Sequence, residues 1–239
     1  MDESTVLASQ PGSFVSDLAG VFDFLIDPQA AARRLPRKYF WLAPLAIISI
    51  VTVIVGVMNF PLVQQALSNQ PPPPNMSPEQ FQQRLRIGFV IQQVLVYLSP
   101  LVIVAATAVC AGVVLFCSTA IGMKARFLEL FNFVAGLSIF DALRAIATTI
   151  IIHFKGEPSS MADLQPALGL DIFAPAGMNR IAVGFLGYFN VFEVWEIVMA
   201  ILIFAAAYRV SKGKALIAVG PIFLLGLLLR LIGAVFSPK

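Results

Sequence analysis

The chain has 239 residues, of which 59% are hydrophobic and only 12% are charged, and its formal net charge is +3 at pH 7. The apolar residues form five long blocks, which excludes an ordinary soluble domain and predicts an all-α integral membrane bundle of five transmembrane helices. A nucleic-acid-binding protein is also excluded, because the chain lacks the basic soluble surface that such binding requires.

The N-terminal segment, residues 1–39, is predicted to be a cytoplasmic region with short amphipathic helices. Six apolar residues recur there at spacings of three and four, namely Phe14, Leu18, Val21, Phe22, Leu25 and Ile26. This helix is too short to cross a bilayer, so we expect it to lie along the interface or to dock on a partner. Asp27 and Pro28 then form an N-cap and first-turn pair that opens a second short helix. Its Arg33 and Arg34 are expected to face anionic lipid headgroups.

Residues 40–239 are predicted to form one membrane domain. Its five spans are expected at about 40–60, 93–122, 127–152, 190–208 and 215–236. The sequence Ser77-Pro-Glu-Gln80 predicts a capping box, so the helix that leads into the second span should begin at Pro78, outside the bilayer. Residues 178–189 are expected to form an interfacial helix before the fourth span.

The basic residues predict how the spans are oriented. Lys and Arg are more numerous on the side that holds the N-terminus than on the opposite side. The positive-inside rule therefore predicts a cytoplasmic N-terminus, and an odd number of spans then places the C-terminus outside.

Five charged residues fall inside the predicted spans. They are Asp141 and Arg144 on the third span, Glu193 and Glu196 on the fourth, and Arg230 on the fifth. A charge at mid-membrane costs roughly 2.5–3.5 kcal/mol on insertion scales, so we expect these five to meet in the outer half of the bundle. One interpretation is an ion-pair network that fixes which helices pack together. The other is a proton or ion path.

No catalytic residue, cofactor site or metal site is expected. Cys110 and Cys117 lie too far apart along one helix for a disulfide, and with the single histidine, His153, they do not make a metal-binding set. The sequence also shows neither a nucleophile–base pair nor a phosphate-binding glycine loop. We therefore predict that the protein is not an enzyme.

Two stretches carry a resemblance to a known family. They are Phe22-Asp-Phe-Leu-Ile-Asp27-Pro28, before the first span, and Asn190-Val-Phe192-Glu-Val-Trp195, continued by Lys212-Gly-Lys214 after the fourth span. Both resemble the bacterial branch of the Yip1-domain family, and the five-span layout does so as well. The resemblance implies a bacterial inner-membrane protein with its N-terminus in the cytoplasm. Eukaryotic members bind Rab-type small GTPases, but the Asp-Leu-Tyr-Gly-Pro motif of that branch is absent, so small-GTPase binding is not expected here.

Three functional hypotheses remain from the sequence. The leading one is a non-catalytic scaffold or accessory subunit of a larger membrane complex, which contacts the bilayer and other membrane proteins. The alternative is a small transporter or an ion- or proton-conducting protein that uses the charge cluster. The third is a membrane-shaping protein that inserts its N-terminal helix as a wedge.

Overall fold

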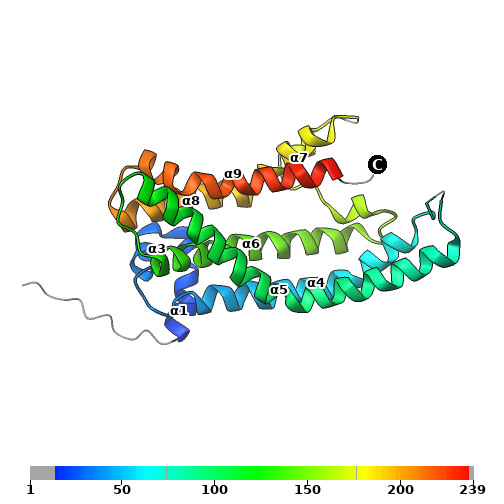
Figure 1. The fold of residues 1–239 in the computed structure, drawn as a ribbon, viewed down its shortest axis with the longest axis horizontal. Helices are drawn as coiled ribbons and strands as arrows, with labels where there is room; N and C mark the ends of the chain where they lie inside the picture. The colour runs from blue at the N-terminus through cyan, green and yellow to red at the C-terminus, as the bar shows by residue number, and fades with distance from the viewer. Residues whose placement is uncertain (1–13, 74, 176, 237–239) are drawn as a thin grey trace, which may run out of the picture.

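The computed structural model describes residues 14–73, 75–175 and 177–236, so the first part of the predicted N-terminal segment lies outside it. Over these residues the chain is helical, and its β pairing is confined to an isolated bridge between Gly169 and Asn190. Five helices are long and apolar enough to cross a membrane (Figure 1). They are α4 (Leu42–Ser68), α5 (Pro78–Ala120), α6 (Phe127–Lys155), α8 (Val191–Tyr208) and α9 (Lys212–Phe236). The predicted all-α fold with five spans is therefore confirmed.

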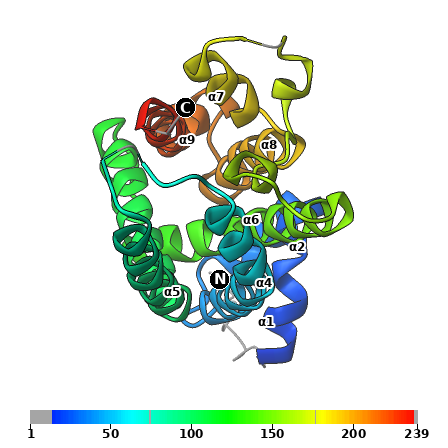
Figure 2. The ribbon, with the colours of Figure 1, turned by 90° about the vertical axis from the view of Figure 1, so that its right-hand side faces the viewer.

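Helices α4 and α6 run side by side in the same direction. The Trp41 backbone N–H donates a hydrogen bond to Asn132 Oδ1 (3.0 Å) near the start of both helices, and further along Asn59 Nδ2 donates to Thr149 Oγ1 (3.1 Å). Seen end-on, α4 and α5 form one side of the bundle, and α7, α8 and α9 form the other (Figure 2). Helix α6 contacts both sides, since it packs on α4, α5 and α8.

Helix α5 begins where the sequence predicts. Ser77 Oγ accepts from the Gln80 backbone N–H, and the Gln80 side chain accepts from the Ser77 backbone N–H (both 3.2 Å), which completes the capping box. The helix has 43 residues, which corresponds to about 65 Å, twice the thickness of a hydrocarbon core. The loop end of the α4–α5 hairpin accordingly extends past the ends of α6 and α9 (Figure 1).

Three short N-terminal helices pack against the opposite end of the bundle. They are α1 (Phe14–Val21), α2 (Asp23–Ile26) and α3 (Pro28–Arg34). The Asp27 carboxylate accepts from the backbone N–H groups of Gln29 (3.0 Å) and Ala30 (2.9 Å), which confirms the predicted N-cap of α3. The buried ring of Phe24 stacks on Phe40 at a centroid distance of 5.7 Å and occupies the space above Gly136 of α6.

Ion pairs hold these helices together, and one of them corrects the sequence analysis. Arg34 lies 3.1 Å from Asp23, and Arg37 lies 2.5 Å from Asp17. Arg34 was expected to face lipid headgroups, but its guanidinium is engaged within the protein. Arg33 remains exposed. The pairing could not be read from the helix pattern, because it joins residues on different short helices.

The predicted apolar stripe of the N-terminal helices divides into two faces. Val21 is fully buried and Leu25 is half-buried. The other four residues of the stripe, Phe14, Leu18, Phe22 and Ile26, are exposed. Because Asp17, Gly20, Val21 and Phe24 form the buried face instead, the N-terminal helices keep an apolar ridge on their outer side.

The loop before the fourth span carries three short elements. The first two are the 3-10 helices η1 (Met161–Leu164) and η2 (Leu170–Phe173), and the third is α7 (Arg180–Tyr188). In η1, hydrogen bonds from Ser159 and Ser160 hold the pKa of the Asp163 carboxyl below its usual range.

Helix α7 packs lengthwise on α9. The Tyr188 hydroxyl donates to the Phe223 carbonyl (2.7 Å), while a Cβ at Gly184 would lie 3.2 Å from Ala234, about three turns further along α9. The predicted helix exists, but it follows α9 instead of lying across the end of the bundle as an interfacial helix would. Small residues at this contact allow the close approach.

Candidate functional site

A cavity of about 400 Å³ lies in the centre of the bundle. Residues from all five long helices and Tyr188 of α7 line it. Asp141 stands at the midpoint of α6, and Phe223 and Gly226 stand close to the midpoint of α9. Hydroxyl groups of Thr52, Thr107 and Ser138 contribute to its polar wall. The cavity therefore lies near the middle of α6 and α9 and beside the first turns of α8.

Arg144 is the cation of this cavity. Its Nη1 donates to Glu193 Oε2 on α8 at 2.7 Å, and its Nη2 pairs with Asp141 one turn earlier on α6. Glu193 is 7% exposed, whereas the Arg144 side chain is 34% exposed, so the pair joins α6 to α8 at the wall of the cavity. The third acid, Glu196, also lines the cavity, and no hydrogen bond or salt bridge to it occurs among the described residues. Four of the five predicted charges thus share one cavity.

The fifth predicted charge, Arg230, does not line this cavity. No salt bridge joins it to an acidic residue of the described chain, and its side chain is exposed on α9. A Cβ at Gly187 would lie 2.5 Å from Arg230 Nη2 and 2.8 Å from Asp171 Oδ2, so both side chains lie against this glycine. Asp171 of η2, which the sequence analysis did not single out, is therefore the acid beside Arg230. The sequence gives no signal for it, since it comes from an irregular loop.

The fourth span begins at the level of the cavity. Asn190 caps α8 by accepting from the backbone N–H groups of Phe192 and Glu193, both at 3.0 Å. Helix α7 ends at Tyr188, so the chain is interrupted between two helices that both pack on α9. Glu193 thus lies in the first turn of α8, beside the partial positive charge of the helix N-terminus. Helices interrupted beside a mid-membrane site are also found in secondary transporters.

Asn132 is a buried structural residue that the sequence analysis missed. Its Nδ2 donates to the carbonyls of Leu35 (2.8 Å) and Arg37 (2.6 Å), while its Oδ1 accepts from the Trp41 N–H. These bonds satisfy backbone groups where the chain turns from α3 into α4. The available signal was a lone amide within an otherwise apolar stretch of the third span.

The residues of the family-like motif form two groups in space. Asp27 and Pro28 open α3, and Asn190 and Phe192 open α8. Trp195 connects the two regions, because its indole N–H donates to the Leu25 carbonyl at 3.0 Å and its ring packs edge-on against Phe140. Lys214 lies exposed in the first turn of α9 and takes no part in this contact.

The described residues contain no group of three or more His, Cys, Asp or Glu side chains arranged to hold a metal ion. Cys110 and Cys117 are free thiols, and Cys110 lines the central cavity. The chemistry offered by the cavity is therefore that of carboxylates, one guanidinium, hydroxyl groups and one thiol.

Five apolar spans around a charged centre define a helical integral membrane protein. The model of the Yip1 domain matches residues 22–232, which is most of the chain, so the protein belongs to the Yip1 domain family. This match confirms the family resemblance seen in the two motif stretches. Comparison with the curated proteins and with the solved structures gives no match.

Proposed function

We propose that the protein is a non-catalytic scaffold or accessory subunit of a larger complex in the bacterial inner membrane. The observation that supports this proposal is the outer ridge of the N-terminal helices, which consists of Phe14, Leu18, Phe22 and Ile26 and is exposed. The helices that carry it are fixed to the bundle by the buried Phe24 and by the Trp195–Leu25 hydrogen bond, and two ion pairs hold the N-terminal segment together.

A ridge held in this way is preorganised for binding. The backbone that carries these side chains is already ordered, so binding a partner costs little additional conformational entropy. More of the free energy of burying the apolar side chains therefore appears as affinity. The ridge lies beside the start of α4, where the chain enters the predicted membrane domain. The occupant we propose is an apolar helix of another membrane protein, which packs along the ridge as in helix-in-groove recognition.

The ridge is tested by the double substitution Phe22→Ser and Ile26→Ser. These side chains are 54% and 79% exposed, so the fold should tolerate the change. Burying each on a partner contributes about 1.5–3 kcal/mol, and losing both should reduce copurification of a stoichiometric partner in mild detergent at least tenfold. The matched control is Ile172→Ser with Phe173→Ser, a pair that is 62% and 80% exposed on η2. Equal loss in both variants, or no loss in either, would remove the ridge as the docking surface.

We also propose that the N-terminus faces the cytoplasm. Cysteines at Asn75, in the α4–α5 loop, and at Ser211, between α8 and α9, should report opposite sides of the membrane, because both positions are exposed. On a background without Cys110 and Cys117, an impermeant thiol reagent should label position 75 in intact cells and position 211 only after permeabilisation. The reverse pattern would invert the topology and place the ridge outside.

A second candidate function, ion or proton conduction, is supported by the central cavity. Glu196 lines it without a partner among the described residues, and the chain is interrupted beside it between α7 and α8. Intramembrane acids that line a cavity are typical of proton and ion paths. Arg144 opposes this function, since it already binds two of the three carboxylates.

A further inference from the structure

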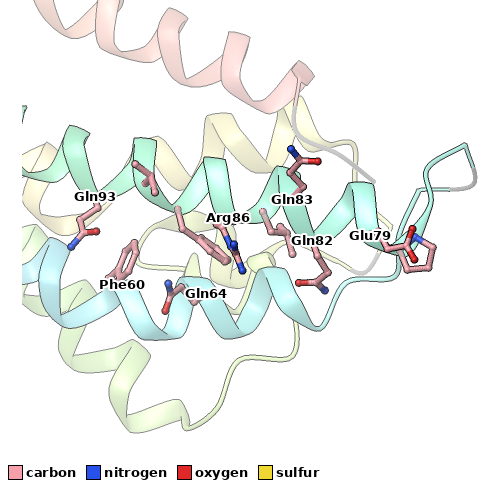
Figure 3. Close-up of a pocket in the computed structure, with 11 residues that line it drawn as sticks. Phe60, Gln64, Glu79, Gln82, Gln83, Arg86 and Gln93 are labelled. Carbon is pink, nitrogen blue, oxygen red and sulfur yellow. The ribbon is translucent and has the colours of Figure 1, made fainter.

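A second cavity, of about 770 Å³, lies between the end of α4 and the beginning of α5 (Figure 3). Its walls carry many amide groups and one guanidinium. Gln64 comes from α4, and Gln82, Gln83, Arg86 and Gln93 come from α5. This composition is unusual beside two apolar spans, and neither the ridge nor the central cavity accounts for it.

The polar groups of this cavity are not used within the fold. None of the hydrogen bonds or salt bridges found in the described part of the chain involves Arg86, Gln64, Gln82 or Gln83. Figure 3 shows Arg86, Gln64 and Gln82 in the space between the two helices, with the Phe60 ring at its left end, toward Gln93. Glu79 is the one acid on the wall, near the start of α5. The cavity thus presents a free guanidinium together with neutral hydrogen-bond donors.

The cavity continues into a smaller apolar one, of about 60 Å³. The two share Phe60 and Gln93, and the smaller one is otherwise lined by Gly56, Val57, Val96 and Tyr97. At Gly56 a Cβ would lie 2.7 Å from Val96, so the two helices meet there and close the groove. The result is a groove that is polar toward the α4–α5 loop and apolar toward the middle of the bundle.

The depth of this groove matches the edge of a bilayer. Gln64 lies twelve residues beyond Thr52 of the central cavity, which is about 18 Å along α4. Half of a hydrocarbon core is about 15 Å. If the central cavity is at the bilayer midplane, Gln64 therefore lies at headgroup level and Gly56 lies among the acyl chains. Arg86 lies seventeen residues before Ile103 of the central cavity, about 26 Å along α5, which places its long side chain at the outer side of the headgroups.

We propose that this groove binds a single phospholipid from the leaflet on the α4–α5 loop side. The lipid phosphate lies on Arg86, whose planar guanidinium matches the geometry of a phosphate, and the glutamine amides donate to the remaining oxygens. The beginning of one acyl chain packs against Phe60 and Phe89. These two rings pack edge-on with 6.3 Å between their centroids, so they form an ordered apolar wall. The ligand class is thus a phosphate-bearing amphiphile, and the hairpin is its receptor.

Native mass spectrometry of the delipidated full-length protein tests the assignment. Added phosphatidylglycerol should give a one-lipid adduct, and Arg86→Gln should weaken it at least tenfold. Arg84→Gln is the matched control, because Arg84 is exposed on the same helix but does not line the groove. It should bind like the wild type.

Two further probes separate the possible sources of the phosphate. Dioleoylglycerol, which has no phosphate, should bind at least tenfold more weakly than phosphatidylglycerol, and millimolar inorganic phosphate should not displace the lipid. Displacement by inorganic phosphate would assign the groove to a free anion instead. Equal lipid adducts in the wild type, Arg86→Gln and Arg84→Gln would overturn the proposal outright, and failure here leaves the ridge experiment unaffected.

Discussion

Replacing Gly136 with alanine is expected to displace the three N-terminal helices from the bundle. A Cβ at this position would lie 2.2 Å from two ring carbons of Phe24, far inside van der Waals contact. The ring cannot simply rotate away, because it is fully buried and stacks on Phe40. Overpacking costs about 1–3 kcal/mol. Loss of the buried Phe24 contact adds to this, since removing a buried phenylalanine costs about 3–5 kcal/mol. Faster limited proteolysis between α1 and α3, together with a lower Tm in detergent, would reveal the displacement.

Two controls separate this clash from a general effect of the substitution. Gly112 lies within α5 and would place a Cβ in open space, so Gly112→Ala should be neutral or raise stability by about 0.5–1 kcal/mol. Adding Phe24→Ala to Gly136→Ala removes the ring that clashes, so the double variant should be more stable than the sum of the single effects predicts. If Gly136→Ala leaves proteolysis and Tm unchanged, the helices are not held by this contact.

This contact links stability to the proposed function. The exposed ridge and the buried Phe24 occupy opposite faces of the same short helices, so the ridge keeps its place only while Phe24 stays seated. Gly136→Ala should therefore weaken partner retention without changing any ridge residue. The Phe22→Ser and Ile26→Ser double variant should also lose the partner, but its N-terminal helices should remain protected from protease.

Sequence reasoning succeeds where the signal is local. The five apolar blocks predict the spans because backbone groups in lipid must bond within their own helix. Asp27 and Ser77 are recognisable as caps because the groups that they bind lie two or three residues away. The helix starts at Pro28 and Pro78 follow directly from these caps.

Sequence reasoning fails where the partner is distant and irregular. Arg144 and Glu193 can pair because they lie at similar depths along their spans. Depth can be approximated by counting residues from the end of a span, so the sequence could indicate this pair. The neighbour of Arg230 is Asp171, in a loop whose path has no periodic pattern. Likewise, a short amphipathic helix does not reveal which part of its apolar stripe is covered. Here the residues that contact the buried face include Gly136 of α6 and Trp195 of α8, both more than a hundred positions away.

A large loss of stability is also expected for Arg144→Leu. This change leaves Glu193, which is 7% exposed, and Asp141 without their shared cation at the centre of the bundle. Removing one partner of a buried ion pair costs about 3–5 kcal/mol, because the remaining charge is uncompensated. Thermal unfolding in detergent measures the effect. Arg230→Leu is the matched control, since Arg230 is exposed and makes no salt bridge within the described chain, and its cost should be much smaller.

Double variants then show which acid depends on Arg144 and which function the cavity serves. Arg144→Leu with Glu193→Gln should recover part of the lost stability, because the uncompensated carboxylate is gone, and this recovery is a coupling energy. Arg144→Leu with Glu196→Gln should recover less, since no ion pair joins these two residues. For a scaffold, partner binding should return together with stability in the Glu193 double variant. For a proton path, Glu196→Gln alone should abolish pH-driven flux in liposomes while the fold stays intact. Strict additivity in both double variants would mean that the Arg144–Glu193 pair does not hold α6 to α8.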